Sequence, residues 1–245
     1  MTSTCDAPVL LVLGAGPGLG MSIAHRFGRA GHRVALVSRG PDRHQGYLAE
    51  LAADGISAIA VAADATDPEQ LRAAVDDVRA QLGRVDVAYV GLGGLDGPHP
   101  SDIRGITSSD LTEAMQLLHA TVHAVSLVLP EMRARGAGGL LFAGGLSAVV
   151  PMPMLGALAP TSAALRTYAL TLHEALREEG VYAGTLTIGG AVERGDIHQH
   201  VLTHPETFGD IGEHTLDPDE IADQAWRMFS DRESPEHVFD VLAPA

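Results

Sequence analysis

The sequence predicts a doubly wound α/β fold built on one parallel sheet. Short apolar runs alternate with longer amphipathic stretches along the chain, an order typical of parallel strands joined by helices that cover both faces of the sheet. A segment rich in glycine directly follows the first apolar run, where such folds bind ligands. The chain has 245 residues and 46% hydrophobic content, so we expect one domain over residues 1–245 with a single core.

Six apolar runs are the predicted strands: residues 9–13, 34–38, 56–62, 85–89, 140–143 and 182–188. Two helix starts are marked by Asp67-Pro68-Glu69-Gln70 and by Asp217-Pro218-Asp219-Glu220. Each places an Asp cap before a proline and a Glu or Gln at the third helical position, which satisfies free N–H groups at a helix start. Long helices are expected over 109–135 and 155–178, and the Gly/Pro-rich segments 91–100 and 151–160 are expected to be loops of the site.

The glycine-rich segment has the order strand, turn and helix that a Rossmann-like dinucleotide site requires. The first predicted strand runs directly into Gly14-Ala15-Gly16-Pro17-Gly18-Leu19-Gly20, and a helical pattern continues from there through Arg29. Glycines let the backbone approach a pyrophosphate held at the helix N-terminus. An ordinary tight turn does not need so many glycines. We therefore predict that Gly14, Gly16, Gly18, Leu19 and Gly20 bind a dinucleotide.

The end of the second predicted strand favours NADP(H) over NAD(H). An NAD-selective site places an Asp or Glu there for the ribose hydroxyls, whereas this chain has Ser38 and Arg39. No carboxylate at this position repels a 2′-phosphate, and the guanidinium of Arg39 is able to pair with it while stacking near the adenine. The alternative role for Arg39 is that of a solvated surface cation.

Over nearly its whole length the chain resembles the short-chain dehydrogenase/reductase family. The segments that carry the resemblance are 13–20, with Leu13 in the place of a Thr, 63–67, 90–93, 129–132 and 163–166. The resemblance implies that Asp64 hydrogen-bonds the adenine and that Ala65, Val90 and Gly91 line the cofactor. It also implies NAD(P)-dependent reduction of a carbonyl or oxidation of an alcohol, and a homodimer or homotetramer formed through the two long helices.

The four residues that carry the family's reaction are missing from their positions. Members use a Tyr acid, a Lys four residues later that lowers the pKa of this Tyr and holds the ribose, a Ser that binds the substrate oxygen and an Asn that holds a water relay. These groups are needed because the alkoxide left by hydride transfer must be protonated or stabilised as it forms. The matching positions here are Leu158, Ser162, Gly145 and Leu117. A shift of two residues would reach Ser147. No shift supplies Lys or Asn, because the chain contains neither, so the catalytic residues stay unassigned.

Few other side chains are candidates for an acid near the cofactor. Leu117, Gly145 and Leu158 predict an apolar nicotinamide side, which Met152 and Met154 extend. Tyr89 is the tyrosine closest to the cofactor edge, although a Tyr in a strand more often packs in the core. Tyr168 and the two histidines of the first long helix, His119 and His123, are expected to point elsewhere.

Residues 189–215 have no clear periodicity and lie at the carboxyl edge of the sheet, so we expect a mobile substrate lid there. Its side chains that could face a substrate, together with two in the preceding site loop, are Glu193, Asp196, His198, Asp96 and His99; solvated positions are the alternative for each. The lid also carries His200, His204 and His214. No Cys or acidic cluster at ligand spacing accompanies these histidines, and no metal site is predicted.

Composition excludes several partner classes. A net charge of −15 without a basic cluster disfavours nucleic acid and anionic membranes. No apolar run is long enough to span a bilayer, the N-terminus lacks a signal peptide, and Cys5 is the only cysteine, so we expect a cytoplasmic protein without a disulfide. Three functions stay open: an atypical NADP(H)-dependent oxidoreductase acting on an apolar small molecule, a silent cofactor-binding subunit or sensor, and a non-redox cyclase or isomerase.

Overall fold

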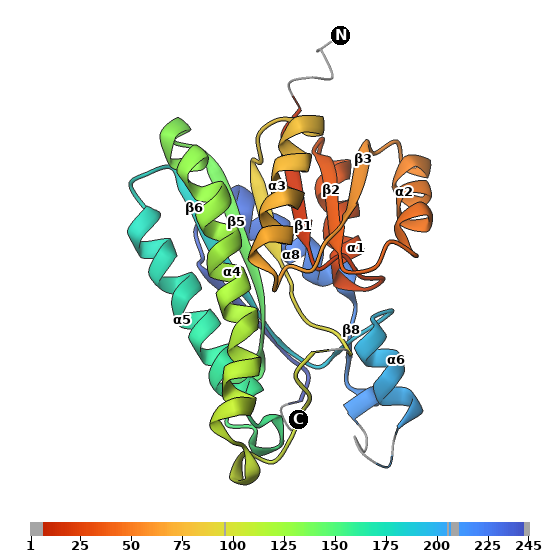
Figure 1. Ribbon diagram of the computed structural model, residues 1–245, viewed down its shortest axis with the longest axis vertical. Coiled ribbons are helices and arrows are strands. Elements are labelled where there is room, and N and C mark those ends of the chain that lie inside the picture. The colour runs from red at the N-terminus through yellow and green to blue at the C-terminus, as the bar shows by residue number, and fades with distance from the viewer. Residues whose placement is uncertain (1–6, 96, 205, 207–210, 243–245) are drawn as a thin grey trace.

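The computed structural model describes residues 7–95, 97–204, 206 and 211–242. Its centre is a seven-stranded parallel sheet with the strand order β3-β2-β1-β4-β5-β6-β9 (Figure 1). The strands are β1 (Val9–Leu13), β2 (Arg33–Ser38), β3 (Ala58–Ala62), β4 (Val87–Val90), β5 (Gly138–Gly145), β6 (Val181–Gly189) and β9 (Glu236–Asp240). The doubly wound fold and the six strands expected from the sequence are confirmed; β9 is an additional strand.

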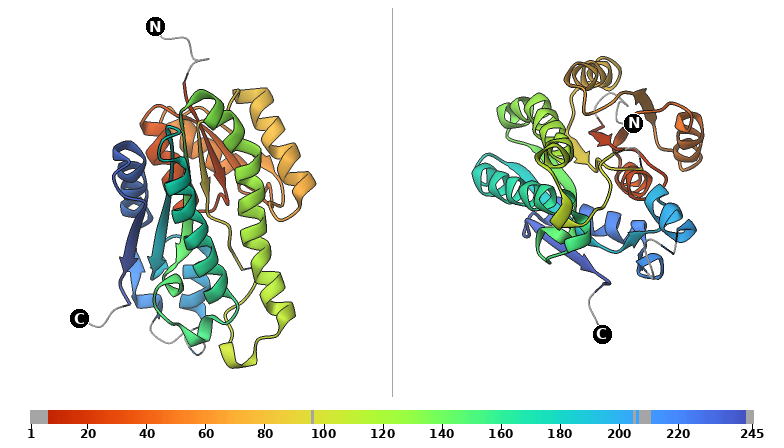
Figure 2. Two further views of the ribbon diagram at one scale, coloured as in Figure 1. Left: turned by 90° about the vertical axis from the view of Figure 1, so that its left-hand side faces the viewer. Right: turned by 60° about the horizontal axis from the view of Figure 1, so that its bottom comes forward.

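Helices cover both faces of the sheet, as two views at right angles show (Figures 1 and 2). One face is covered by α3 (Pro68–Leu82), α4 (Ser108–Arg135) and α5 (Leu158–Leu176). The other is covered by α1 (Leu19–Arg29), α2 (His44–Ala53) and α8 (Pro218–Asp231). None of the helices in the described part of the chain is long and apolar enough to cross a membrane.

The remaining elements lie at the carboxyl edge of the sheet or beside it. They are η1 (Ile103–Gly105), η2 (Leu146–Ala148), η3 (Pro153–Leu155), α6 (Asp196–Thr203), η4 (Ile211–Glu213) and the two-stranded ladder of β7 (Ala191–Val192) and β8 (Thr215–Leu216). The segment 189–215 is therefore partly regular, contrary to the expectation from the sequence. Its helix α6 is short and buries Val201 against the fold, which explains the weak periodic signal.

Strand β1 shows why the sequence pattern identifies the sheet. All five of its residues are fully buried. Val9, Leu11 and Leu13 pack in one core, whereas Leu10 and Val12 pack in the core on the opposite face. A strand covered on both faces needs apolar side chains at every position, so a continuous apolar run marks it.

The two predicted Asp caps are confirmed. Asp67 accepts hydrogen bonds from the N–H groups of Glu69 and Gln70 at the start of α3, and Asp217 accepts one from Asp219 at the start of α8. The start of α5 is a correction, because the helix begins at Leu158 and not at residue 155. Gly156 has a φ of +48°, and this left-handed residue separates the helix from η3.

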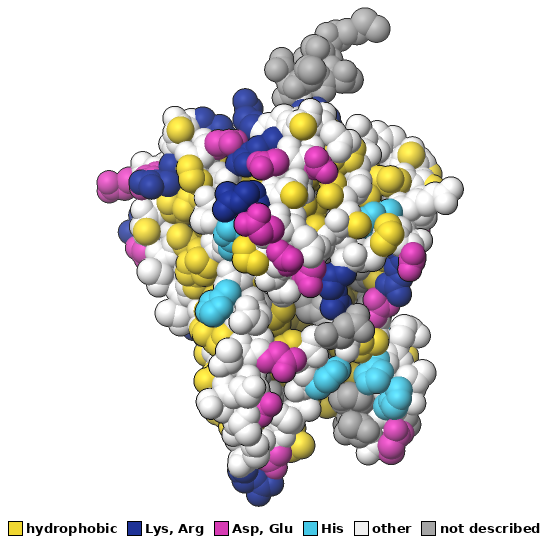
Figure 3. Space-filling view, in the orientation of Figure 1, with side chains coloured by type: hydrophobic (Ala, Val, Ile, Leu, Met, Phe, Trp, Pro, Cys, Tyr) yellow, Lys and Arg dark blue, Asp and Glu magenta, His cyan; other side chains and the backbone are white. Residues whose placement is uncertain are grey.

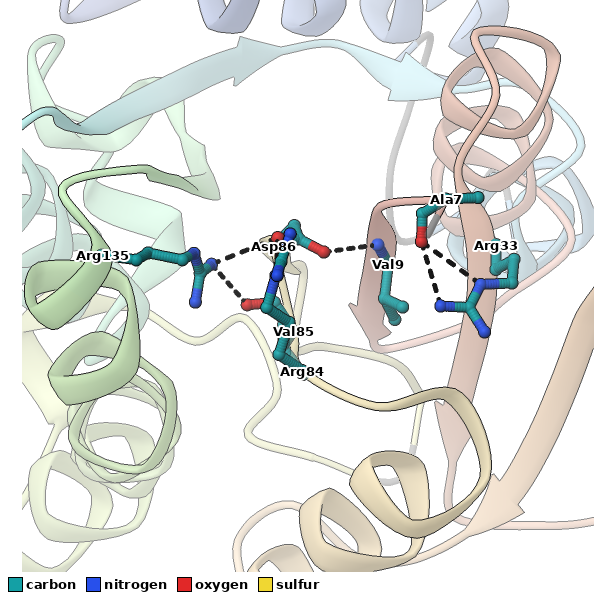
Figure 4. A network of polar contacts seen from close by, with 7 residues as sticks. All are labelled: Ala7, Val9, Arg33, Arg84, Val85, Asp86 and Arg135. Carbon is teal, nitrogen blue, oxygen red and sulfur yellow. Dashed lines mark hydrogen bonds and ion pairs between the residues drawn. The ribbon is translucent and has the colours of Figure 1, made fainter. Parts of the chain in front are cut away.

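A polar network fastens the amino edge of the sheet (Figure 4). Asp86 Oδ2 accepts a hydrogen bond of 2.9 Å from the N–H of Val9, and Asp86 Oδ1 accepts one of 2.9 Å from Arg84 Nε. Arg135 Nη2 donates to the carbonyl of Val85 and lies 3.5 Å from Asp86 Oδ1. Burial lowers the pKa of Arg135. These contacts join the starts of β1 and β4 to the end of α4.

Candidate functional site

The candidate site lies at the carboxyl edge, where the strand order reverses. β1 has β2 on one side and β4 on the other, so the chain leaves β1 at the topological switch point at which open α/β sheets bind ligands. Residues 14–20, which we call the glycine turn, join β1 to α1 at this point. The structure thus places the predicted dinucleotide residues where the fold opens.

Close backbone contacts explain Gly14 and Gly20 in this turn. Gly14 has a φ of +93°, and a methyl group on it would lie 2.2 Å from the carbonyl oxygen of Gly91 at the end of β4. A methyl group on Gly20 would lie 2.7 Å from the oxygen of Gly14. The N-terminus of α1 has no side-chain cap and no acidic residue in its first turn. The turn can therefore present N–H groups to an anion.

The segment after β7 packs against the glycine turn. A methyl group on Gly18 would lie 3.0 Å from the oxygen of Glu193 and 3.1 Å from Gly195. Arg194 has a φ of 64°, a conformation that costs a residue other than glycine of order 1–3 kcal/mol. Its guanidinium lies 2.8 Å from Asp219 and 3.2 Å from Asp217. These ion pairs hold the residues just before α6 beside the N-terminus of α8.

Two arginines and a histidine lie around the end of β2. Arg39 Nη2 lies 2.9 Å from the position of a methyl group on Gly94, so its side chain extends over the loop after β4. Arg43 Nη1 donates a 2.7 Å hydrogen bond to Asp196 Oδ2 on α6. Ser38 Oγ lies 2.7 Å from His44 Nε2, and burial lowers the pKa of His44. The sequence pointed to Ser38 and Arg39, whereas Arg43 and His44 were missed, although they follow within six positions of Ser38.

Asp64 and its neighbours form an ordered loop at the end of β3. Asp64 Oδ1 accepts hydrogen bonds from the N–H and hydroxyl groups of Thr66, and the N–H of Asp64 donates to Gln70 Oε1. The side chains of Ala65 and Val90 are buried in the core. These two residues are therefore limited to backbone contacts with a cofactor.

Tyr89 packs in the core, as its place in a strand predicts. It is 2% exposed and lies among apolar side chains on the α1 side of the sheet. A methyl group on Gly91 would lie 2.3 Å from its hydroxyl oxygen, so the ring fills the space beneath Gly91. Burial raises the pKa of Tyr89. This phenol is not placed to serve as an acid at the cofactor.

Two serine hydroxyls converge on Gly145. A methyl group on Gly145 would lie 3.3 Å from Ser162 Oγ on α5 and 3.5 Å from Ser147 Oγ on η2. Ser147 Oγ is buried and has no hydrogen-bond partner among the described residues. Leu158 begins α5 one turn before Ser162. The sequence drew attention to each serine separately, but it did not show that they meet.

Several lid side chains are engaged in polar contacts. Glu193 Oε1 accepts a 2.7 Å hydrogen bond from Thr215 Oγ1, and Asp196 is paired with Arg43. His198 Nδ1 is buried without a partner in the described part of the chain. No group of three His, Cys, Asp or Glu side chains among the described residues is arranged to hold a metal ion. Asp96 lies outside the described residues.

A pocket of about 420 Å³ opens beside the loop between β4 and α4. Its lining residues are Pro98, His99, Pro100, Ser101, Asp102, Gly105, Ile106, Asp110, Glu113 and Ala157. Figure 3 shows the surface hollowed between the lobe at this end of α4 and the lobe that carries α6. Exposed apolar side chains belong to both lobes: Val149, Val150 and Met154 on one, and Ile197, Leu202 and Ile211 on the other.

Comparisons with known proteins place these features in context. The family model described as short chain dehydrogenase matches residues 8–198. The 1-deoxy-11-beta-hydroxypentalenate dehydrogenase of Streptomyces exfoliatus is 30% identical over 225 residues, which cover 91% of this chain and 80% of that protein. The 7alpha-hydroxysteroid dehydrogenase of Escherichia coli K12 is 29% identical over 207 residues, which cover 81% of this chain and 80% of that protein.

Solved structures share the fold. The L-sorbose reductase of Gluconobacter frateurii, complexed with NADPH and L-sorbose, superposes with a TM-score of 0.83 at 24% identity and covers 96% of this chain and 95% of its own. YwfH, an NADPH dependent reductase involved in bacilysin biosynthesis, superposes with a TM-score of 0.85 at 19% identity and covers 96% of this chain and 98% of its own.

Proposed function

Because the chain belongs to the short-chain dehydrogenase family, we propose that it is an NADP(H)-dependent oxidoreductase acting on the carbonyl or alcohol group of an apolar small molecule. The observation that carries this proposal is the close approach of Gly14 to Gly91 at the switch point. Because a side chain at Gly14 would collide with the backbone of Gly91, the turn presents its bare backbone here, which suits a ligand that contacts backbone atoms. When bound, the cofactor supplies or accepts a hydride.

The end of β2 supports NADP(H) as the cofactor. Arg39 and Arg43 bring two guanidinium groups to this end of the site, and no carboxylate stands in the position that contacts the ribose hydroxyls of NAD(H). Guanidinium groups are suited to bidentate pairing with a phosphate. We assign Asp64 at the end of β3 to the adenine, on the resemblance to the family. These residues bind and orient the cofactor and take no part in proton transfer.

Exposed apolar side chains on the two lobes beside the hollow support an apolar substrate. Apolar side chains are exposed on both lobes, and exposed apolar surface beside a cleft is typical of a ligand-binding groove. Two relatives are dehydrogenases of a hydroxypentalenate and of a hydroxysteroid. We therefore propose an apolar ring alcohol or ring ketone as the substrate class.

The proton comes from solvent in this proposal, because the chain has no Lys and its Tyr89 is buried. A missing acid typically costs about 10²–10⁴ in rate, so turnover is expected to be slow. A cofactor-binding subunit or sensor without turnover is the second candidate, and the absence of the usual acid and ammonium favours it. A cyclase or isomerase that uses the apolar site for shape is the third.

Titration of the protein with NADPH, followed by fluorescence, tests the cofactor site, and loss of NADPH absorbance with a panel of steroid ketones and quinones tests the reaction. We expect binding of NADPH and slow turnover of apolar ketones. Absence of NADPH binding would overturn the proposal. Tight binding without turnover of any ketone in the panel would favour the second or third candidate.

A further inference from the structure

We propose that His44 is a positioning residue for cofactor specificity, and that it takes up a proton when the 2′-phosphate of NADP(H) binds. The preference for NADP(H) over NAD(H) then increases as pH falls. This proposal rests on the proposed function, because it names a residue that controls cofactor choice in the same site. His44 acts through Ser38 and has no part in hydride transfer.

The contact between His44 and Ser38 is the first support. Ser38 Oγ lies 2.7 Å from His44 Nε2 and donates a hydrogen bond of 3.2 Å to the carbonyl oxygen of Gly40. A hydroxyl group has a single hydrogen to donate. While that hydrogen points to Gly40, the short contact requires His44 to donate its ring N–H to Ser38. The hydroxyl hydrogen is then the group that Ser38 is able to offer to a ligand.

A serine held in this way favours a ligand that accepts a hydrogen bond. Ser38 is the last residue of β2, where Rossmann-like sites contact the adenosine ribose. Phosphate oxygens are strong acceptors, so turning the Ser38 hydrogen from Gly40 to a 2′-phosphate replaces a long hydrogen bond by one that charge strengthens. The neutral ribose hydroxyl of NAD(H) offers no such gain.

The second support is the burial of the His44 ring. The residue is 8% exposed, and burial lowers its pKa, so the ring is mainly uncharged at pH 7 in the free protein. A phosphate bonded to Ser38 places negative charge one hydroxyl group away from the ring, and a nearby opposite charge favours protonated histidine. The complex therefore holds more protons than the free protein, and by linkage it becomes more stable as pH falls.

The other ionisable groups around His44 leave this role to the phosphate. On the elements around it they are Arg39, Asp42, Arg43, Tyr47 and Glu50 on its own segment, Asp64 after β3, Asp196 on α6, and His25, Arg26 and Arg29 on α1. Arg43 is paired with Asp196, and His25 and Arg29 are bonded to Asp54 beyond the far end of α2. In the described part of the chain none of these groups is hydrogen-bonded to His44. Burial alone accounts for its lowered pKa, so no carboxylate already favours the protonated ring.

Fluorescence titration with NADPH between about pH 6 and pH 8 tests the linkage. The phosphate itself takes up a proton near pH 6, so the wild type is compared with His44→Gln, whose amide keeps an N–H donor but does not titrate. From pH 8 to pH 6 the NADPH affinity of the wild type relative to that of the variant should rise by about three- to tenfold, equivalent to at most about one pKa unit. The same ratio for NADH should not change with pH.

His44→Leu separates the two roles of the residue, because it removes the donor as well as the proton. At pH 8 it should bind NADPH about two- to tenfold more weakly than His44→Gln, as for loss of one hydrogen bond.

His32→Gln is the matched control. His32 is 7% exposed, burial lowers its pKa, and its ring donates to the carbonyl of Phe27. It directly precedes β2, at the end of the strand opposite Ser38. Its replacement should leave the pH dependence of NADPH binding unchanged.

Proton NMR of the histidine rings tests the proposal on the wild type alone, so the result does not depend on how well the variants fold. One histidine should titrate at a higher pH with NADP⁺ than with NAD⁺, and its signal should be missing from His44→Gln.

The outcomes separate this proposal from the proposed function. If NADPH binds with the same pH dependence in the wild type and in His44→Gln, and NADP⁺ shifts no histidine beyond the effect of NAD⁺, His44 has no such role and the cofactor site stands. An equal pH response for NADH would also overturn the role of His44, since NADH has no 2′-phosphate. Absence of NADPH binding would overturn both proposals.

Discussion

Arg43 Nη1 donates a 2.7 Å hydrogen bond to Asp196 Oδ2 across a sequence separation of 153 residues. The contact joins the residue before α2 to the first residue of α6, and it lies at the end of the site proposed for the 2′-phosphate. Asp196 therefore neutralises a cation that a phosphate would otherwise use.

Asp196→Asn should tighten binding of NADPH by up to about fivefold, because an exposed ion pair contributes about 0–1 kcal/mol. Binding of NADH should not change, since it has no 2′-phosphate. Fluorescence titration with both cofactors measures the effect. Asp42→Asn removes a carboxylate beside Arg43 without breaking the pair and should have the smaller effect. An equal gain for NADH would contradict a role of Arg43 at the phosphate.

Arg39→Ala should reduce the preference for NADPH over NADH. The wild type is expected to bind NADPH at least about tenfold more tightly, since a charge-assisted contact contributes about 1.5–3 kcal/mol. The variant should bind NADPH and NADH with nearly equal affinity. Asp64→Ala is the control, because the adenine is common to both cofactors and both affinities should fall alike. Equal affinity of the wild type for NADPH and NADH would show that the prediction is wrong.

The triple variant Leu158→Tyr, Ser162→Lys and Gly145→Ser should gain NADPH-dependent reduction of ring ketones. Lys supplies the charge that lowers the pKa of the new Tyr, and the new Ser takes the substrate oxygen. A methyl group at position 145 would lie at an ordinary contact distance of 3.5 Å from Ser147 Oγ, and the closer hydroxyl, that of Ser162 at 3.3 Å, is removed in this variant. Leu158→Tyr alone should do little, since an unperturbed Tyr has a pKa of about 10. A folded triple variant that binds NADPH without activity would count against a redox site.

Acid should weaken the contact between α5 and β9. Arg166 holds the pKa of Glu236 below its ordinary value, with a smaller contribution from the hydroxyl of Thr187. A carboxyl whose pKa is lower in the folded state stabilises the fold above the pKa of the unfolded chain, and this contribution is lost as pH falls through the lower folded value. Glu236→Gln should therefore lower the free energy of unfolding at pH 7 by about 1–3 kcal/mol. In a plot of melting temperature against pH, the decline on the acid side should be less steep for the variant than for the wild type. The exposed pair partner Glu174, changed to Gln, should have little effect.

A homo-oligomer formed through α4 and α5 is expected, and it should show a mass above the 25.5 kDa of the monomer in light scattering. Val122 is 40% exposed on α4, so Val122→Glu should shift the protein toward the monomer. Gln116→Glu adds a charge elsewhere on the same helix and should not. A monomer mass for the wild type at micromolar concentration would refute the prediction.

The strands buried on both faces were predictable, whereas the edge strand and the short helix were not. Runs such as Val9–Leu13 are apolar at every position, because cores on both faces demand it. In β9, which lies at the edge of the described sheet beside β6, Glu236 and His237 precede a half-exposed Val238. Helix α6 has eight residues and buries Val201 alone among them. Neither segment carries the apolar pattern from which elements are recognised.

The glycine turn could be located from sequence because its residues are consecutive. The pair Arg43 and Asp196 and the pair Ser147 and Ser162 could not, since each joins side chains from two different elements. Which side chains meet depends on how the elements pack, and spacing along the chain does not contain that information. The same limit hid the contact of Gly18 with Gly195, which seats the segment after β7 on the glycine turn.

The polar network around Asp86 at the amino edge of the sheet is separate from the positions at which the chemistry would be changed. It ties Val9, Val85 and Arg135 together at the end of the strands opposite the glycine turn. Substitutions at positions 145, 158 and 162 that introduce an oxygen-binding hydroxyl, an acid or an ammonium group do not change any contact of this network. The chemistry at the carboxyl edge can therefore be altered by substitution without loss of the contacts that stabilise the amino edge.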